Sequence, residues 1–264
     1  LKVKYTDTDG NTFKLEEHEF MQFKVEDVPG YVKRNATACN FFPKELIKRK
    51  SSITEGAGQF RACGRLALIK NMSEENKASL RNAIDKVRLW QPDRNGKYEV
   101  DNSAPVRVFV VFSIAGGTGA GSFIDLPLIL KSNNILEPGE KIAAIALLPE
   151  VYANKGFSAI HCKPNAIVGM TEYEFIADGV LEDMEPDAEA PSRRIKTPSG
   201  VTYQVEKDYL YDQFFLVNNR SSLGIQYQSD DEMADFISKA LYLAAGFTGS
   251  VNNSSLDNIT TNRN

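Results

Sequence analysis

Short apolar runs alternate with helical patterns along the chain. Runs rich in branched and aromatic residues predict buried strands at 106–114 (VRVFVVFSI), 141–152 (KIAAIALLPEVY) and in 211–224 (YDQFFLVNNRSSLG). The last of these segments includes a polar loop after its strand. Apolar residues recur at helical spacing in three other segments, 73–90, 163–184 and 229–247. Strands that alternate with helices predict an α/β fold, with a parallel sheet and helices on both of its faces.

Capping residues sharpen the prediction for the first of these helices. Ser73 is its expected N-cap, and Leu80, Ile84, Val87 and Leu89 are expected to form its apolar face.

Three other segments have weaker patterns. The first eleven residues predict a short strand that ends in an acidic turn. The segment 185–208 is rich in proline, serine and charge, which favours a surface excursion with a small hairpin. The helix at 229–247 has acidic residues in its first turn, which suit the positive end of a helix dipole.

The strand at 106–114 runs into the segment Ala115–Ser122 (AGGTGAGS), which we call the glycine loop. Its glycines are Gly116, Gly117, Gly119 and Gly121. A helix that starts here would present unpaired backbone N–H groups and the positive end of its dipole, which together bind anions such as phosphate. Glycines would let phosphate oxygens approach the backbone, and Thr118 would add a hydroxyl. The alternative is a tight turn that packs a helix onto the sheet, a role for which four glycines in six residues are more than expected.

Other phosphate motifs fit this loop less well. No Gly-Lys-Ser/Thr sequence closes it, so it is not a Walker A motif. An NAD(P)- or flavin-dependent enzyme is disfavoured, because no acidic residue that could bind a ribose follows the next strand and no catalytic histidine arrangement is present.

Composition narrows the possible functions. The chain has 264 residues, 42% of them hydrophobic and 25% charged, with a formal net charge of −4. These values favour a globular protein and give no electrostatic reason to bind nucleic acid or anionic lipid. No apolar run is long enough to span a membrane. Only His18 and His161 are available, so a multi-histidine metal site is excluded. Scattered cysteines predict reduced thiols and a cytoplasmic location, at Cys39, Cys63 and Cys162.

Three segments together carry a resemblance to a known family. After its apolar strand, the glycine loop resembles the tubulin signature loop. Gly56–Leu68 (GAGQFRACGRLAL) is similar to the γ-phosphate loop of the bacterial cell-division homologue FtsZ, and Tyr5–Gly10 (YTDTDG) resembles that family's second loop. The order matches as well. The chain is therefore identified as a member of the tubulin/FtsZ superfamily, nearest to bacterial tubulin-like proteins with a GAGQxRxxGRxAL element.

The resemblance implies a Rossmann-like domain over residues 1–248 that binds GTP or GDP with Mg²⁺. The α- and β-phosphates would be held by the glycine loop, through Ala115, Gly116, Gly117, Thr118, Gly119, Ala120 and Gly121. The γ-phosphate would be met by Gly56, Ala57, Gly58 and Gln59. Asp7 or Asp9 would lie near the magnesium, through water. Because no Walker lysine is present, backbone dipoles and Mg²⁺ must balance the triphosphate charge. Arg61 and Arg65 are further candidate phosphate partners, and for Arg65 a position on the helix surface is an equal alternative.

Guanine recognition is implied for asparagines, with Asn165, Asn218 and Asn219 as candidates and turn or cap chemistry as the alternative. Phe236 is a candidate to stack on the base or, alternatively, a core residue of its helix.

The family hydrolyses GTP with an acidic loop that reaches the next subunit. The tail 249–264 aligns with that loop through Asn252 and Asp257, the expected catalytic residues, while Ser254 replaces an expected aspartate. The family's first strand and phosphate loop have no counterpart, so we expect an upstream segment.

These features together predict a GTP-binding protein that is a slow GTPase, activated by head-to-tail self-assembly into filaments. Adaptor proteins are possible additional partners. The alternative, favoured by Ser254, is a non-polymerising nucleotide-sensing scaffold or regulatory module with little GTPase activity.

Overall fold

The computed structural model describes most of the chain outside its C-terminal tail. The described ranges are 4–6, 12–14, 21–89, 105–132, 134–152, 160–177, 194–196, 202–204, 210–220, 224, 226–227 and 229–244. The chain divides into two units, Leu1–Val217 and Asn218–Asn264, which are treated separately below. The domain boundary predicted at 248/249 stays a prediction.

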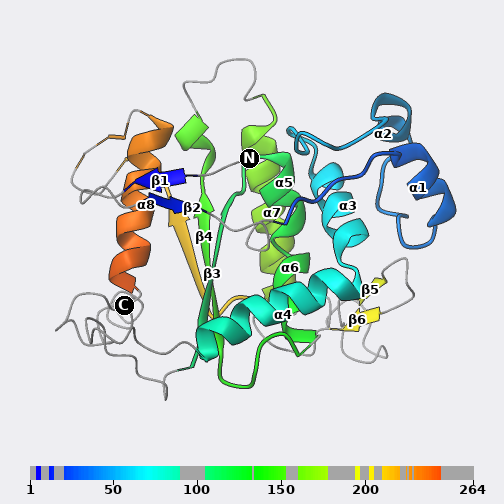
Figure 1. The fold of residues 1–264 in the computed structure, drawn as a ribbon. Helices are drawn as coiled ribbons and strands as arrows, with labels where there is room; N and C mark the ends of the chain where they lie inside the picture. Colours follow the sequence, from blue (N-terminus) through cyan, green and yellow to red (C-terminus); the bar gives the residue numbers. More distant parts are fainter. Residues whose placement is uncertain are drawn as a thin grey trace. The chain divides into compact units, whose positions relative to one another are not determined.

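A parallel three-stranded sheet is the centre of the first unit (Figure 1). Its strands are β3 (Arg107–Ser113), β4 (Lys141–Leu147) and β7 (Gln213–Val217), in the order β3-β4-β7. Their register places Ala144 of β4 opposite both Val110 of β3 and Phe214 of β7. The central strand is buried over most of its length, as its uninterrupted apolar sequence predicts. The prediction of an α/β, Rossmann-like fold is confirmed.

Strand β4 is shorter than predicted. It ends at Leu147 rather than continuing to Tyr152. The N–H of Leu148 still donates to the carbonyl of Val217 at 2.9 Å, but Pro149 follows and has no N–H to extend the ladder.

Seven α-helices of the first unit and one of the second lie within the described residues. Those of the first unit are α1 (Val28–Arg34), α2 (Lys44–Arg49), α3 (Arg61–Asn71), α4 (Glu74–Arg88), α5 (Gly117–Ser122), α6 (Asp125–Ser132) and α7 (Cys162–Ala177). The second unit contains α8 (Asp230–Ala244), with the acidic first turn expected from the sequence.

Two small antiparallel hairpins accompany these elements. The first joins β1 (Lys4–Thr6) to β2 (Thr12–Lys14), so the short strand predicted at the start of the chain is confirmed. The second joins β5 (Arg194–Lys196) to β6 (Thr202–Gln204) and confirms the hairpin predicted in 185–208.

Helix α4 confirms its predicted cap and corrects its predicted face. The hydroxyl of Ser73 accepts a hydrogen bond from the N–H of Asn76 at 3.2 Å. Leu80 and Ile84 pack against the core, but Val87 and Leu89 are 61% and 78% exposed. The buried stripe continues at i+4 from Ile84, and this position is occupied by Arg88, not by an apolar residue.

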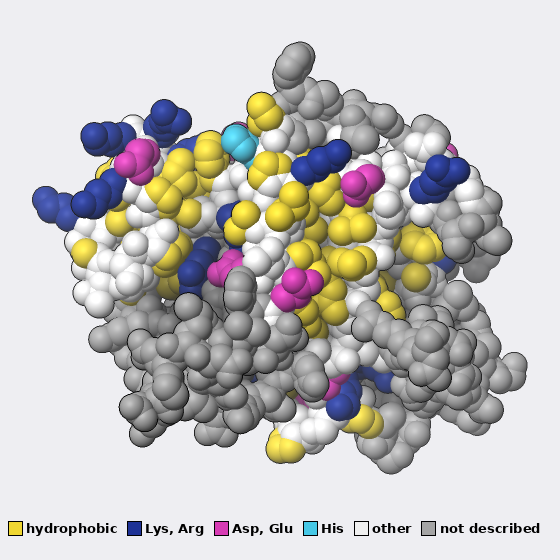
Figure 2. All heavy atoms as spheres, turned by 180° about the vertical axis from the view of Figure 1, so that it is seen from behind, with side chains coloured by type: hydrophobic (Ala, Val, Ile, Leu, Met, Phe, Trp, Pro, Cys, Tyr) yellow, Lys and Arg dark blue, Asp and Glu magenta, His cyan; other side chains and the backbone are white. Residues whose placement is uncertain are grey.

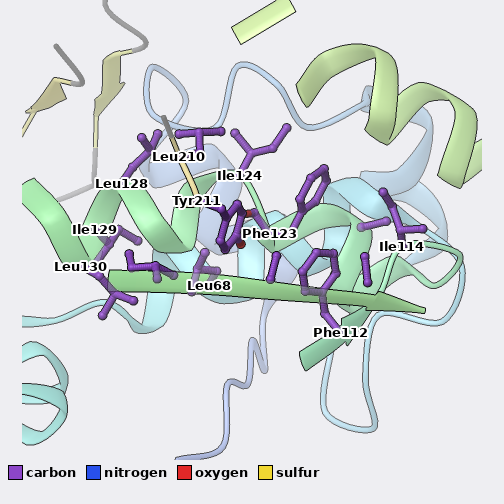
Figure 3. Close-up of a cluster of buried hydrophobic side chains, with 14 of the residues drawn as sticks. Leu68, Phe112, Ile114, Phe123, Ile124, Leu128, Ile129, Leu130, Leu210 and Tyr211 are labelled. Carbon is purple, nitrogen blue, oxygen red and sulfur yellow. Dashed lines mark hydrogen bonds between the residues drawn. The ribbon is translucent and has the colours of Figure 1, made fainter. Parts of the chain in front are cut away.

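The main core lies on one face of the sheet (Figure 3). Alternate residues of β3 and β4 point into it, including Phe112 and Ala144. Phe112 stacks on Phe123, with ring centroids 5.2 Å apart, and the hydroxyl of Tyr211 donates to the carbonyl of Phe123. A second apolar cluster joins α1, α2 and the buried side of α3 through Val28, Leu46, Leu66 and others. Helix α3 therefore takes part in both cores, with Leu68 and Ile69 in the first.

The three cysteines are free thiols, as predicted, and all are buried. Burial raises the pKa of the thiols of Cys39, Cys63 and Cys162, so each is held in its neutral form.

Arg88 anchors the end of α4 to the segment that precedes β4. Its guanidinium donates to both carboxylate oxygens of Glu140, to Asp85 and, at 3.0 Å, to the carbonyl of Ile135. The side chain of Glu140 is only 5% exposed. The hydrogen bond from Arg88 outweighs the effect of burial and holds the pKa of Glu140 below its ordinary value of 4.5.

We expect Glu140→Gln to remove a pH-dependent part of the stability. A carboxyl with a lowered pKa stabilises the fold above its unfolded pKa, and this contribution is lost as the pH falls through the folded pKa. The variant should be less stable than the wild type by about 1–3 kcal/mol at pH 7 and show a shallower loss of stability below pH ~4.5. Urea denaturation at several pH values measures this. Parallel curves for the two proteins would contradict the assignment.

Candidate functional site

Two loops that are far apart in the sequence lie against each other beyond the carboxyl end of β3. One is the glycine loop defined above, whose residues from Gly117 onwards form α5. The other is Gly56–Phe60, here called the GAG loop, which leads into α3. The N–H of Gly117 donates to the carbonyl of Gly58 at 2.7 Å, and the N–H of Ala57 donates to the hydroxyl of Thr118 at 3.2 Å. The structure thus brings together the two segments predicted to hold phosphates.

The start of the glycine loop is shaped by the last residue of β3. The hydroxyl of Ser113 accepts hydrogen bonds from the N–H groups of Ala115 and Gly116, at 3.2 and 3.3 Å. Helix α5 then begins without a side-chain cap. The N–H groups of Thr118 and Gly119 lie in its first turn, where no acceptor exists within the helix. The sequence predicted a loop before a helix, whereas here most of the glycine loop is the helix.

Three of the four loop glycines have the packing role that the sequence pattern argued against. A Cβ on Gly121 would lie 2.1 Å from the carbonyl oxygen of Arg61, and one on Gly119 would lie 2.3 Å from that of Ser113. On Gly117 it would lie 2.6 Å from the backbone nitrogen of Phe60. Gly64 of α3 completes the contact, because its Cβ would meet the carbonyl of Gly117 at 2.2 Å. Helices α3 and α5 therefore touch backbone to backbone.

Gly116 is the exception. Its backbone angles, φ −89° and ψ 172°, suit any residue, and the nearest atom to an added Cβ is the Ser113 hydroxyl, at 3.9 Å. The space beside Gly116 is therefore not required by the fold.

Gly121→Ala and Gly116→Ala should affect stability differently. We expect Gly121→Ala to destabilise the fold by about 2 kcal/mol or more, because the methyl group has to displace backbone atoms of α3. Gly116→Ala should change the free energy of unfolding by less than about 0.5 kcal/mol. Thermal and urea denaturation of both variants provide the comparison. Equal stabilities would show that the α3–α5 contact is looser than described.

The GAG loop needs its glycines for backbone conformation. Gly56 has φ +96° and Gly58 has φ +58°, values that residues other than glycine rarely adopt. Within this loop, Ala57 is buried whereas both glycines are exposed.

The two arginines considered as phosphate partners are engaged in ion pairs. Arg65 pairs with Asp125, which is fully buried, at 2.6 Å, and its guanidinium carbon lies 4.6 Å from the ring centroid of Phe41. Arg61 donates to the carbonyl of Ala120 at 3.0 Å and pairs with Glu172 of α7. These contacts attach α3 to α5, α6 and α7. Both arginines therefore have a structural role in joining these helices.

Helix α7 contributes Asn165, one of the predicted base-recognition residues. Its side-chain amide is directed at the two loops and donates to the carbonyls of Gln59, at 2.9 Å, and Ala115, at 3.0 Å. Beside it, the backbone N–H of His161 donates to the side-chain oxygen of Gln59 at 2.8 Å.

Helices α1 and α2, which share an apolar cluster with Ala57 and Phe60 of the GAG loop, contain more basic than acidic residues, although the whole chain is acidic. Lys33, Arg34, Lys44, Lys48 and Arg49 are exposed on α1 and α2, and Figure 2 shows such side chains gathered over these helices. The next residue, Lys50, places its ammonium group 5.1 Å from the ring centroid of Phe60 in the GAG loop. A local excess of positive charge favours an anionic ligand.

The remaining predicted residues lie either outside the described residues or in the second unit. Asp7, Asp9, Asn252 and Asp257 lie outside the described residues. Asn218 and Asn219 belong to the second unit, where the N–H of Asn219 donates to the side chain of Asn218 at 2.6 Å. This bond is local and joins adjacent residues.

Phe236 is 38% exposed and packs on Tyr227 of the same unit, with ring centroids 5.1 Å apart. It is therefore not a fully buried core residue of α8.

In the part of the chain that the structure describes, no three His, Cys, Asp or Glu side chains are grouped to hold a metal ion. No described helix is long and apolar enough to cross a membrane.

Comparison with known proteins decides the family. The model of a family described as tubulin-like matches residues 8–262, which is nearly the whole chain. The chain belongs to the tubulin-like family. No curated protein and no solved structure shows significant similarity to it. The matched residues include both loops and the three strands of the parallel sheet.

Sequence reasoning missed how the loops are connected. Asn165, Arg61 and Glu172 join segments that are 50 to 111 positions apart, and no local pattern indicates such pairs. The available signal for the α3–α5 contact was Gly64, which lies inside the helical pattern "RACGRLAL". A glycine inside a helix often has a packing role.

Proposed function

We propose that this tubulin-like protein binds GTP with Mg²⁺ where the GAG loop meets the start of α5. The observation that carries the proposal is the direct pairing of the two glycine-containing loops through Gly117, Gly58, Ala57 and Thr118. Loops of this kind beyond the ends of parallel strands are a frequent location of phosphate sites. The family match and the basic residues of α1, α2 and Lys50 support the same ligand.

The proposed division of roles follows the backbone. The first-turn N–H groups of α5, at Thr118 and Gly119, would meet the α- and β-phosphates. The exposed Gly58 of the GAG loop would meet the γ-phosphate. Asp7 or Asp9 remains the proposed magnesium contact, and Asn218 and Asn219 remain the proposed guanine contacts. Mg²⁺ would neutralise phosphate charge, since the arginines nearest the loops, Arg61 and Arg65, are already paired.

We further propose that GTP hydrolysis is slow in the monomer and is accelerated by head-to-tail self-association into filaments. Asp257 and Asn252 would act on the γ-phosphate of the neighbouring subunit. The proposed location is the cytoplasm.

Gly116→Ala should weaken GTP binding without weakening the fold. The added methyl group enters space that the protein itself does not fill but a bound phosphate would. We expect a rise in Kd of about tenfold, which corresponds to 1.4 kcal/mol. Titration calorimetry with GTP and Mg²⁺ on wild type and variant measures it. An unchanged Kd would place the nucleotide elsewhere.

The self-association proposal predicts that GTP turnover per molecule rises with protein concentration, together with light scattering. Asp257→Ala should lower turnover by about a hundredfold while leaving GTP binding intact. Asn258→Ala, at the next position, is the matched control. Tight binding with flat, negligible turnover would favour the nucleotide-sensing scaffold instead. Absence of GTP binding by the full chain would overturn the proposed function.

A further inference from the structure

Asn165 forms a single connection between three elements. It lies on α7, is 9% exposed, and each of its two amide hydrogens has a different acceptor. One acceptor, the carbonyl of Gln59, belongs to the GAG loop; the other, the carbonyl of Ala115, belongs to the glycine loop. Both acceptors are carbonyl oxygens, so only the amide nitrogen can face them, and the orientation of the side chain is fixed.

The position of Asn165 makes its hydrogen bonds hard to replace. It is buried next to Ala166, which is part of the main core, and a buried carbonyl left without a partner carries a large free-energy penalty. While both hydrogens are held by the loops, neither is available to a nucleotide base, and only the side-chain oxygen could accept a further hydrogen bond. These two hydrogen bonds give Asn165 a structural role that does not depend on contact with a base.

Two further contacts attach the same loops to α7. The backbone N–H of His161, just before the helix, holds the side-chain oxygen of Gln59. Arg61, the first residue after the GAG loop, bridges the carbonyl of Ala120 in α5 and Glu172 in α7. A displacement of Gln59 must therefore either move the start of α7 or break these hydrogen bonds.

We infer that Asn165 is a positioning residue that locks the GAG loop and the glycine loop to each other and to α7. The lock holds both loops in one arrangement and transmits a displacement of the GAG loop, as on gain or loss of a terminal phosphate, to α7. The ligand in this inference rests on the proposed function, but the lock itself rests only on the contacts. Asn165 acts through the loop backbones and touches no substrate.

The lock predicts how loop order depends on Asn165. Without its amide, the two loops should open locally more often, while the sheet keeps its order. Hydrogen–deuterium exchange of the full chain without nucleotide measures this directly. In Asn165→Ala, exchange should be about tenfold faster or more in peptides covering 56–60, 115–122 and the start of α7, and unchanged in β4.

A matched control is available on α3. Asn71 also donates its side-chain amide to two backbone carbonyls, those of Lys24 at 3.0 Å and Ala67 at 2.8 Å. Asn71→Ala loses the same two kinds of hydrogen bond away from the loops, so it should leave loop exchange unchanged. Asn165→Leu, which fills the space without the amide, serves if Asn165→Ala does not fold, and it should reproduce the faster exchange. Loop exchange equal to that of Asn71→Ala would overturn the inference.

A second measurement separates this inference from base recognition and from the proposed function. The lock predicts that Asn165→Leu reduces the preference for GTP over GDP by about tenfold, because the loop that meets the γ-phosphate is no longer held in place. Equal weakening of GTP and GDP, with lost discrimination against ATP, would overturn the lock in favour of base recognition. If the wild type binds no nucleotide, the proposed function fails, and the exchange experiment still decides the lock.

Discussion

The backbone contact between α3 and α5 is the constraint on which the described structure depends. Gly64 and Gly121 let the two helices approach until a single methyl group at either position would clash, and Gly117 has the same role against the GAG loop. Dispersion attraction falls off steeply with distance, and closely packed backbones leave no free space between them. A contact this close therefore tolerates little change in the angle between the helices. The GAG loop, which leads into α3, and the glycine loop, which forms α5, are held together as a consequence.

The same contact explains the electrostatics of the region. Helix α3 brings Arg61 and Arg65 next to α5, where backbone carbonyls and the acidic residues Glu172 and Asp125 receive them. A carboxylate as deeply buried as Asp125 is strongly unfavourable without a nearby cation. The arginines therefore stabilise the fold, and the charge of any anionic ligand has to be met by backbone dipoles, by a metal ion and by the lysines of the exposed surface.

The sequence allowed the fold to be predicted further than the site. Apolar runs located all three strands of the sheet, and the hydroxyl of Ser73 marked the start of α4, because both signals are local. The apolar face of α4 was misjudged at Val87 and Leu89, since the position that continues the buried stripe contains a charged residue whose partner, Glu140, is 52 positions away. Composition alone does not show that an arginine can occupy a core-facing position.

The site was predicted in its parts and not in its connections. The GAG and glycine loops were identified by residue type, but the reason for most of their glycines is steric, and this became visible only when α3 was placed against α5. Asn165 was selected as a polar residue in a suitable segment, whereas its observed partners are two backbone carbonyls in other segments. A side chain's partner across such a distance is set by the tertiary structure and leaves no periodicity in the sequence.

The long sequence separations within the site also have a consequence for biosynthesis. The hydrogen bonds that join its elements connect residues 50 to 111 positions apart, from Asn165 with Ala115 to Arg61 with Glu172. Contacts of this kind form late, because closing long loops has an entropic penalty that local contacts avoid. During synthesis, the GAG loop would leave the ribosome more than a hundred residues before its partners on α7. The site therefore cannot be completed before α7 has been synthesised.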